Sequence, residues 1–455
     1  MKSLLYISII ILLCTTSCRK YVEIPPENAR ELKETRDYQS LLNNASLLFE
    51  RTYIYPIWAS DDAGTNDLPW QNAQNAMITN AYTWAPKIWG QTQEDVDWQN
   101  LYKSMFTANT VITEVMASIG GTDAQKRKAY AEALVHRAYL YHTLVNIYAK
   151  QYDAATAAAD PGVPVLLDNR LFANLTRWSV AAVYEQVIKD LEAALPELPD
   201  QPDFVTNPGK GAAYAMLARV YLNQRKWQDA RRFADSALRL KSGLIDLNGF
   251  VNSTTGYPRK INDPEVIFSK LTGPGITTVP LSDGLMALFD TKDLRYRIYT
   301  RPGAQITRSN FTNRGYMKHQ IVTDGIYVGP SVPEMMLTKA ECEARLDNAA
   351  AATDLLNTLR KKRFTAADYV DVPVTNAADA LQAVVAERRR ELMGTGMRWF
   401  DQRRLQKDPS FNFITPVIRI FKGTTYTLPP GSNLYVFAIA DRYIQLNPEI
   451  EQNPR

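Results

Sequence analysis

The sequence predicts a mainly α-helical protein in which tetratricopeptide-like helix pairs form a scaffold, with long loop-rich insertions that contain a few short strands. Apolar residues recur at helical spacing over 101–150 and again over 332–363. Alanines and aromatic residues in 207–242 fall at the relative spacings of a tetratricopeptide helix pair. Stretches rich in Gly, Pro, Thr and Asn separate these regions.

The chain starts with the features of a bacterial lipoprotein signal peptide. Lys2 precedes an apolar run from Leu4 to Leu13, and small residues then lead to Cys18. The run is too short to span a membrane, because a spanning helix needs about 20 apolar residues. We therefore predict that residues 1–17 are removed and that Cys18 carries the lipid as the first mature residue. An ordinary secretory peptide that is cleaved elsewhere is the alternative.

Three helical regions follow between residues 101 and 242. Gly120-Gly121 separates two long helices, and the second is expected to run from about Asp123 to Lys150. Ser179 is placed to begin a third helix, which Pro196 ends. The helix pair over 207–242 is the most specific of these signals, because small alanines allow close approach while aromatic rings fill the space between the helices. Its pattern is carried by Ala218, Tyr221, Trp227, Ala230 and Ala237.

Further helix pairs are expected in the second half of the chain. One covers 332–363, with its turn at 346–348, and another joins the helix at 379–393 to the helix after Gly396. Because a solenoid needs about three repeats, these pairs are expected to pack together although they are far apart in the sequence.

Two stretches, 50–100 and 243–330, are expected to be loop-rich insertions, and Glu265–Phe268 is a short β-like run within the second. Both are too long to be simple connectors, and long structured loops on a rigid scaffold often carry binding sites. The first stretch is rich in aromatic, amide and acidic side chains, which can stack on sugar rings and bond their hydroxyls. The candidate ligand-binding residues are Trp58, Trp70, Trp84, Asp67 and Asn72, with Arg314, Tyr316 and Tyr327 as weaker candidates. The alternative is that these aromatic residues pack as core beneath the loops.

Composition and missing motifs narrow the classes of function. A net charge of +4 over 455 residues argues against a dedicated nucleic-acid-binding protein. The sequence holds no HExxH, CxxC, GxSxG, P-loop or GxGxxG motif, so we predict no enzyme activity, metal or cofactor. Asp61-Asp62 and Asp67 could form a glycosidase carboxylate pair, but a structural or solvated role is preferred. Cys342 is expected to be a small buried apolar residue.

The C-terminal motifs resemble those of one family. Residues 387–392 read ERRREL, 396–401 read GMRWFD, and Leu-Asn-Pro at 446–448 precedes Gln-Asn-Pro at 452–454. In this order they resemble the SusD/RagB family of nutrient-binding outer-membrane lipoproteins of Bacteroidetes, and the resemblance covers essentially the whole mature chain. Gln402 stands where that family usually has Leu, and Ala440-Asp441 replaces its usual Pro before a terminal strand-like segment.

The resemblance implies one SusD-like domain over 18–455. Its helical scaffold would cover about 101–242 and 332–405, with the insertions at about 50–100 and 243–330 and a C-terminal segment at 406–455. Within the C-terminal motifs, Glu387, Arg390 and Asp401 are expected to form ion pairs that fix the last helices. Trp399 and Phe400 are expected in the core.

The resemblance also implies a function in nutrient uptake of the starch-utilization type. The protein would be a non-catalytic carbohydrate-binding lipoprotein, anchored by lipid in the outer membrane and facing the cell exterior. It would capture a glycan or another nutrient and deliver it to a SusC-like TonB-dependent transporter. A lipidated tetratricopeptide scaffold that binds envelope proteins is the second hypothesis, and a glycosidase is the third.

Overall fold

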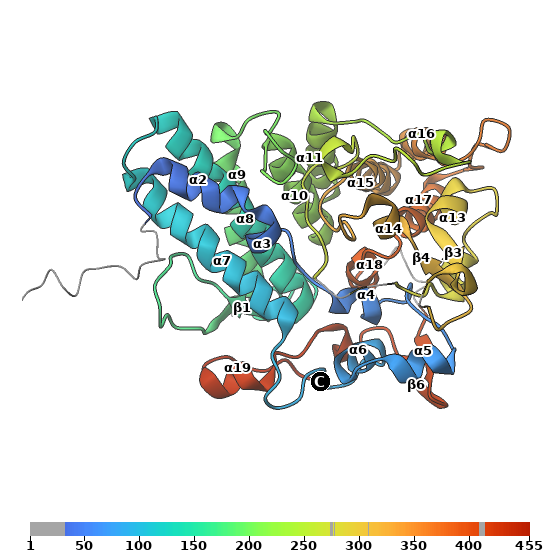
Figure 1. Ribbon diagram of the computed structural model, residues 1–455, viewed down its shortest axis with the longest axis horizontal. Coiled ribbons are helices and arrows are strands. Elements are labelled where there is room, and N and C mark those ends of the chain that lie inside the picture. Colours follow the sequence, from blue (N-terminus) through green and yellow to red (C-terminus); the bar gives the residue numbers. More distant parts are fainter. Residues whose placement is uncertain (1–31, 274–275, 277, 308, 409–414) are drawn as a thin grey trace, which may run out of the picture.

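The computed structural model describes residues 32–455 except 274, 275, 277, 308 and 409–414. The predicted signal peptide and Cys18 lie outside the described residues. Figure 1 shows long helices over most of the molecule, with short helices and a hairpin gathered along its lower edge. No helix within the described ranges has both the length and the apolarity needed to cross a membrane.

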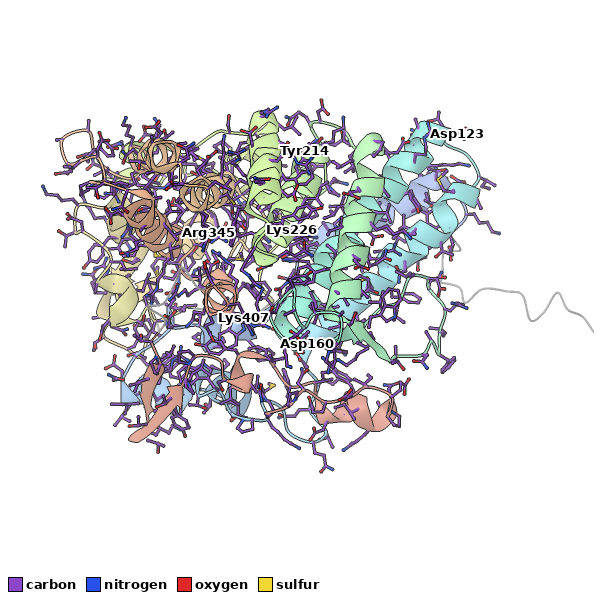
Figure 2. The ribbon with its side chains drawn as sticks, turned by 180° about the vertical axis from the view of Figure 1, so that it is seen from behind. Asp123, Asp160, Tyr214, Lys226, Arg345 and Lys407 are labelled. Carbon is purple, nitrogen blue, oxygen red and sulfur yellow. The ribbon has the colours of Figure 1, made fainter. Side chains whose placement is uncertain are left out.

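The first half of the chain is centred on α8 (Asp123–Tyr148). Thr122 and Gln125 form a reciprocal capping box at its start, and its residues from Ala131 to Tyr148 are all buried. A helix whose side chains on every face are apolar, or are polar and hydrogen-bonded, is expected in a protein core. Neighbouring helices cover α8 in this way. These neighbours are α2 (Thr35–Asn43), α7 (Val96–Glu114), α9 (Val180–Ala194) and α10 (Lys210–Asn223). Figure 2 shows Asp123 at one end of α8 and Asp160 beyond its other end.

The predicted helix pairs are present and pack together. α10 packs on α11 (Trp227–Leu240), and α11 packs on α15 (Val332–Arg345). α15 in turn contacts α16 (Ala349–Arg360) and α17 (Ala377–Glu391), and α18 (Met397–Leu405) follows. Fully buried alanines carry the close contacts between α10, α11 and α15, namely Ala215, Ala218, Ala234, Ala237 and Ala340. The mainly α fold class with tetratricopeptide-like pairs is therefore confirmed.

Within the part of the chain that the structure describes, the strands form three separate antiparallel pairs. They are β1 (Pro161–Pro164) with β2 (Arg177–Ser179), β3 (Thr300–Pro302) with β4 (Arg314–Tyr316), and β5 (Val417–Phe421) with β6 (Thr424–Leu428). Lys422 and Gly423 join β5 to β6 with φ angles of 49° and 78°. Two successive positive φ values are typical of the tight turn that matches the twist of a hairpin.

Several segments differ from the sequence expectation. Residues 50–100 are rich in short helices, namely α4 (Tyr55–Ala59), α5 (Leu68–Ala73) and α6 (Ala76–Tyr82), and α7 already begins at Val96. Proline in the first turn of α4 and α5 and the Asn75 cap of α6 favour these helix starts. The β-like run 265–268 forms only an isolated bridge between Val266 and Ser331. Instead of a terminal strand, the chain forms helix α19 (Asp441–Leu446).

The remaining elements are short. They are α3 (Ala45–Leu48), α12 (Asp283–Met286), α13 (Leu294–Ile298), α14 (Lys318–Val322), and the 3₁₀ helices η2 (Val115–Ala117), η3 (Leu195–Glu197), η4 (Leu247–Phe250), η5 (Lys260–Asn262), η6 (Gly303–Gln305) and η7 (Asn433–Tyr435). Most of them lie in the 243–330 stretch, so that this stretch consists of loops, short helices and one small strand pair.

The ERRREL and GMRWFD motifs form a buried ion-pair network, as predicted. Glu387 is fully buried and lies 2.6 Å from both Arg295 and Arg390. Asp401 pairs with Arg388 at 2.9 Å and with Arg404 at 2.8 Å. The Trp399 side chain is buried in the core and Phe400 is partly buried against it, while Cys342 is buried in α15. These carboxylates and guanidiniums hold α17 and α18 in a single arrangement.

Candidate functional site

A surface groove of about 530 Å³ lies where three distant parts of the chain meet. One wall comes from the loop 61–67, a second from 282–284 and 312–313, and the third from the start of β5. Among its polar side chains, Asn66, Asp283 and Thr312 are exposed, and Asp67 and Asn313 are half-buried. The groove therefore joins the two predicted insertions to a hairpin of the C-terminal segment.

The walls of the groove are joined by hydrogen bonds between loops. The amide of Asn313 donates to the carbonyls of Gly64 and Leu281 at 2.7 Å each. Asp67 accepts from the backbone N–H of Thr312 at 2.6 Å and from its hydroxyl at 3.0 Å. These bonds hold the pKa of Asp67 below its ordinary value, so that its carboxylate is ionised at neutral pH.

Arg419 of β5 supports the floor of the groove from below. Its guanidinium is buried and donates to the carbonyls of Trp58 and Ala63 at 2.8 and 2.9 Å. It also donates to the carbonyls of Ser60 and Tyr82. Because it also lies 4.0 Å from the centre of the Tyr82 ring, it ties the loop before the groove to the end of α6.

The structure places the three predicted tryptophans beneath the groove. Trp58, Trp70 and Trp84 are only 3%, 3% and 4% exposed. Trp70 packs against Trp58 and Tyr82, with ring centres 5.9 and 5.3 Å apart, and Trp84 donates to the Ala59 carbonyl at 2.8 Å. In this structure the rings are therefore part of the core and present no open face to a ligand. Their contact with ligand stays a prediction.

The other candidates have different positions. Asp67 lines the groove, whereas Asn72 is exposed on α5 and outside the lining. Arg314 stacks on Tyr296, with its guanidinium carbon 3.9 Å from the ring centre. Tyr316 and Tyr327 lie elsewhere, at a cavity beside α14.

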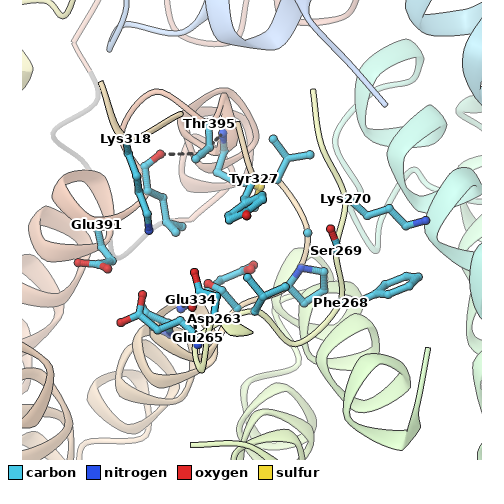
Figure 3. Close-up of a pocket in the computed structure, with 18 of the residues that line it drawn as sticks. Asp263, Glu265, Phe268, Ser269, Lys270, Lys318, Tyr327, Glu334, Glu391 and Thr395 are labelled. Atoms are coloured by element: carbon cyan, nitrogen blue, oxygen red, sulfur yellow. Dashed lines mark hydrogen bonds between the residues drawn. The ribbon is translucent and has the colours of Figure 1, made fainter. Parts of the chain in front are cut away.

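That second cavity has a volume of about 60 Å³ and a strongly charged lining. Figure 3 shows Asp263 and Glu265 on one side of it and Tyr327 on the other. Lys270 is almost fully buried, donates to the Phe49 carbonyl at 2.8 Å and lies 3.0 Å from Nδ1 of His136. Burial lowers the pKa of Lys270 to about 7 and raises that of Asp263 to about 6. The volume accommodates a few water molecules rather than a sugar ring.

The Asp61-Asp62 pair has a structural role in the arrangement. Asp61 forms two bonds with Arg398, at 2.7 and 2.9 Å, and Asp62 lies 2.6 Å from Arg389. Burial raises the pKa of Asp61, but the guanidiniums of Arg398 and Arg389 outweigh this effect and hold the pKa below its ordinary value. Both carboxylates are thus paired with arginines of the C-terminal motifs.

Sequence reasoning missed most of the groove. Asn66 lies in the amide-rich stretch 50–100 but is not among the candidate residues, and the sequence around Asp283, Thr312, Asn313 and Arg419 gives no signal of a site. Each is a common polar residue in an unremarkable local sequence, and only the packing of separate segments brings them to one place.

The comparisons with known proteins agree with the architecture. Residues 20–222 match a SusD-like family described as "Starch-binding associating with outer membrane", and residues 332–455 match the family described as "SusD family". Together the two matches span most of the chain. This protein belongs to the SusD family. Among curated proteins, none matches it.

Solved SusD-family structures share the fold along nearly the whole chain. A SusD superfamily protein from Bacteroides thetaiotaomicron is 20% identical, with a TM-score of 0.74 over 93% of this chain and 100% of its own. A SusD-like carbohydrate-binding protein from Bacteroides vulgatus is 20% identical, with a TM-score of 0.66 over 92% and 98%. A laminarin-binding SusD-like protein is 18% identical, with a TM-score of 0.64 over 93% and 100%. At these identities the likeness establishes the fold.

Proposed function

We propose that this SusD-family protein binds a glycan in the groove formed by 61–67, 282–284, 312–313 and β5. The observation that carries the proposal is the lining of the groove, where amide, hydroxyl and carboxylate groups converge from three loops. Such groups bond sugar hydroxyls, and a volume of about 530 Å³ lies within the range of small-molecule sites. Val417 and the exposed Ile418 add an apolar edge for the C–H face of a sugar ring.

Within this proposal, Asp67 contacts the ligand in the groove and Asn72 contacts it from the neighbouring face of α5. Trp58, Trp70 and Trp84 shape the floor from below, and they reach the ligand only if the loop 61–67 moves aside. Fluorescence titration with glycan tests such a movement. Quenching of tryptophan emission in the wild type, and its loss in Trp70→Phe, would identify it.

Calorimetric titration with starch-type α-glucan oligosaccharides and with laminarin oligosaccharides tests the groove. Replacing two exposed groups, in Asn66→Ala/Asp283→Ala, is expected to weaken binding at least tenfold, because each lost hydrogen bond costs about 1 kcal/mol. Asn252→Ala, an exposed asparagine outside the groove, is the matched control and should bind like the wild type. Equal affinity for all three proteins would contradict the proposed site.

We further propose that the protein binds its glycan without chemical change. The SusD family is a carbohydrate-binding family, and Asp61 and Asp62 are both engaged by arginines. Incubation with the same glycans should leave them intact. Hydrolysis that is abolished by Asp62→Asn would support an enzyme instead.

The proposed cellular role is delivery of the glycan to a SusC-like TonB-dependent transporter, from a lipid anchor at Cys18 on the outside of the outer membrane. Native protein purified from membranes should carry acyl chains on Cys18 by mass spectrometry and should be accessible to protease on intact cells. A TonB-dependent barrel should copurify with it. Copurification of envelope proteins without any such barrel would favour the scaffold alternative.

A further inference from the structure

The loop between β1 and β2 exposes an apolar tip. Leu171 is 72% exposed and Phe172 is fully exposed at this tip, and both project into solvent. Phe172 also has a φ of 59°, which is rare for a bulky residue. Large apolar side chains that are held out of the core in this way often mark a contact surface.

The stem of this loop is held firmly by buried groups of α7 and α8. The amide of Asn109 donates to the carbonyls of Leu166 and Asp168 at 2.8 and 3.1 Å. Arg137, itself paired with Asp190 at 2.7 Å, donates to the Leu167 carbonyl at 3.1 Å. The exposed tip therefore projects from a rigid base, and Figure 1 shows the loop projecting from the side of the molecule next to α7.

Two further apolar side chains widen the surface. Leu167 is 39% exposed at the start of the loop, and Phe106 of α7 is 47% exposed. Phe106 shares a helix face with Tyr102 and Asn109, which both bond the segment 164–168. We call Phe106, Leu167, Leu171 and Phe172 the apolar tip surface. Arg170 lies within it with its side chain 80% exposed, and its guanidinium is paired with the carboxylate of Asp168 at 2.7 Å.

The tip surface is adjacent to the point where the described chain begins. The Tyr38 hydroxyl lies 3.3 Å from the Leu32 carbonyl and 3.0 Å from Oε2 of Glu114. The other oxygen of the Glu114 carboxylate accepts from the amide of Asn169 at 2.6 Å. Hydrogen bonds through Tyr38 and Glu114 thus connect Leu32 to Asn169 of the loop. Asn169 precedes Leu171 by two residues.

Residues 19–31 connect Leu32 to Cys18. Fourteen peptide units span at most about 50 Å, so a lipid on Cys18 keeps this side of the molecule within that distance of the bilayer. An exposed surface of leucine and phenylalanine side chains suits the interface of a membrane, where such side chains enter the acyl boundary. No other large apolar side chains as exposed as Leu171 and Phe172 adjoin each other among the described residues.

We propose that the apolar tip surface inserts into the lipid surface beside the anchor and gives the protein a second membrane contact. This inference rests on the lipidation of Cys18 in the proposed function. A tether raises the local concentration of the tip at the bilayer, so even two inserted side chains would remain bound for much of the time. The contact would fix which face of the protein is turned toward the membrane.

A fluorescent label at the tip tests the insertion. In the lipidated mature protein Phe172→Cys provides one accessible thiol, because the sulfur of Cys18 carries the lipid and Cys342 is fully buried. The mature protein, labelled there with a polarity-sensitive dye, is reconstituted into phosphatidylethanolamine/phosphatidylglycerol vesicles. We expect a blue shift of emission and quenching by brominated acyl chains, whereas the same dye at Val370→Cys, also 72% exposed, should show neither.

A partition measurement gives the second readout. Protein without lipid on Cys18 is mixed with the same vesicles and sedimented, and Leu171→Ser/Phe172→Ser is expected to lower the partition coefficient at least tenfold. Glycan affinity of this variant should be unchanged, which separates the tip from the groove. Absence of a blue shift and of vesicle binding would overturn the proposal, as would a shift that appears only when outer-membrane proteins are added.

Discussion

The buried guanidinium of Arg419 donates hydrogen bonds to four backbone carbonyls rather than to a carboxylate. These bonds hold the backbone that forms the floor of the groove. The carbonyls of Trp58, Ser60 and Ala63 point toward one guanidinium because the backbone there leaves helix α4 and turns toward the groove. A lysine has one nitrogen and could not reach all of them. A single side chain from the C-terminal hairpin therefore orders a loop about 360 residues earlier in the chain.

Arg419→Met is expected to lower the free energy of unfolding by about 3–5 kcal/mol and to weaken glycan binding in parallel, since it leaves buried carbonyls without donors. Arg419→Lys should recover part of both losses. Urea unfolding and calorimetry measure the two effects. Lys422→Met, at an exposed position on the same hairpin, is the control and should change neither the stability nor the affinity. Unchanged glycan binding in Arg419→Met would show that Arg419 does not support the groove.

Glu391 illustrates the role of charge in the core at the same scale. It lies 2.7 Å from both Arg295 and Arg363 with its side chain 3% exposed. Burial raises its pKa, but the guanidiniums of Arg363 and Arg295 more than reverse this and bring the pKa to about 2, from an ordinary value of 4.5. Because the folded pKa is depressed, the stabilisation is complete above about pH 4.5 and is lost as the pH falls toward 2.

Glu391→Gln is therefore expected to destabilise the protein most at pH 7, by about 3–5 kcal/mol, because two guanidiniums lose a buried partner. The difference from the wild type should shrink between pH 4.5 and pH 2, where the wild-type carboxylate is itself progressively protonated. Urea unfolding at pH 7, 4 and 3 measures this trend. A constant or growing difference at low pH would contradict the assigned direction of the pKa shift.

At the scale of elements, alanine seams allow the helix pairs to form one scaffold. α11 lies between α10 and α15 and uses Ala234 and Ala237 where helices approach most closely. Aromatic rings fill the wider gaps, as in the stacked pair Tyr221 and Phe233 with ring centres 5.5 Å apart. The pairs from the two halves of the chain thus form a continuous stack, although 243–330 separates them in sequence.

Ala234→Leu is expected to cost about 1–3 kcal/mol, because three extra carbon atoms have no space in a packed seam. Helix content by far-ultraviolet circular dichroism should be retained while the urea midpoint falls. Ala350→Leu is the control, since Ala350 is exposed in the first turn of α16 and should shift the midpoint little. Equal effects of the two substitutions would mean that α11 and α15 do not pack closely there.

At the scale of the whole molecule, the C-terminal segment connects regions that are distant in sequence. The amide of Asn453 donates to the carbonyls of Tyr148, at the end of α8, and Phe437, at 2.7 and 2.8 Å. Arg177 reaches the same residue from β2 at 2.8 Å. The Gln-Asn-Pro motif is thereby a structural joint between the central helix and the segment before α19.

Asn453→Ala should lower the free energy of unfolding by about 1–3 kcal/mol, because the Phe437 carbonyl loses its side-chain donor and the Tyr148 carbonyl keeps the Arg177 bond at 3.2 Å but loses the shorter one. Asn447→Ala is the matched control: its amide bonds the carbonyl of Tyr443 within the same helix end, and its loss should cost less than about 0.5 kcal/mol. Thermal or urea unfolding measures both. Equal losses would show that Asn453 makes no special long-range contribution.

Local patterns predicted most of the helical scaffold. The signals that predicted these helices act over a few residues each, so they can be recognised in the sequence alone. They are the capping residue Ser179, the proline after α9, and the alanine spacing of α10 and α11. The short helices α4–α6 were missed because each is shorter than the window in which helical periodicity becomes visible. The run 265–268 has strand-like composition, but it has a single bridge partner and no strand beside it.

The sequence by itself determined the helix pairs, the ion-pair motifs and the family, because these depend on residue spacing within short segments. Only the tertiary structure decided where the ligand-binding candidates lie. The same aromatic density in 50–100 suits either a sugar platform or a core, and the choice depends on what covers the rings. Here Arg419 of the β5–β6 hairpin lies over the Trp84 ring and bonds the Trp58 carbonyl, and Trp70 packs against Tyr82. The three tryptophans are therefore buried, and Asp67 and Tyr82 line the groove instead.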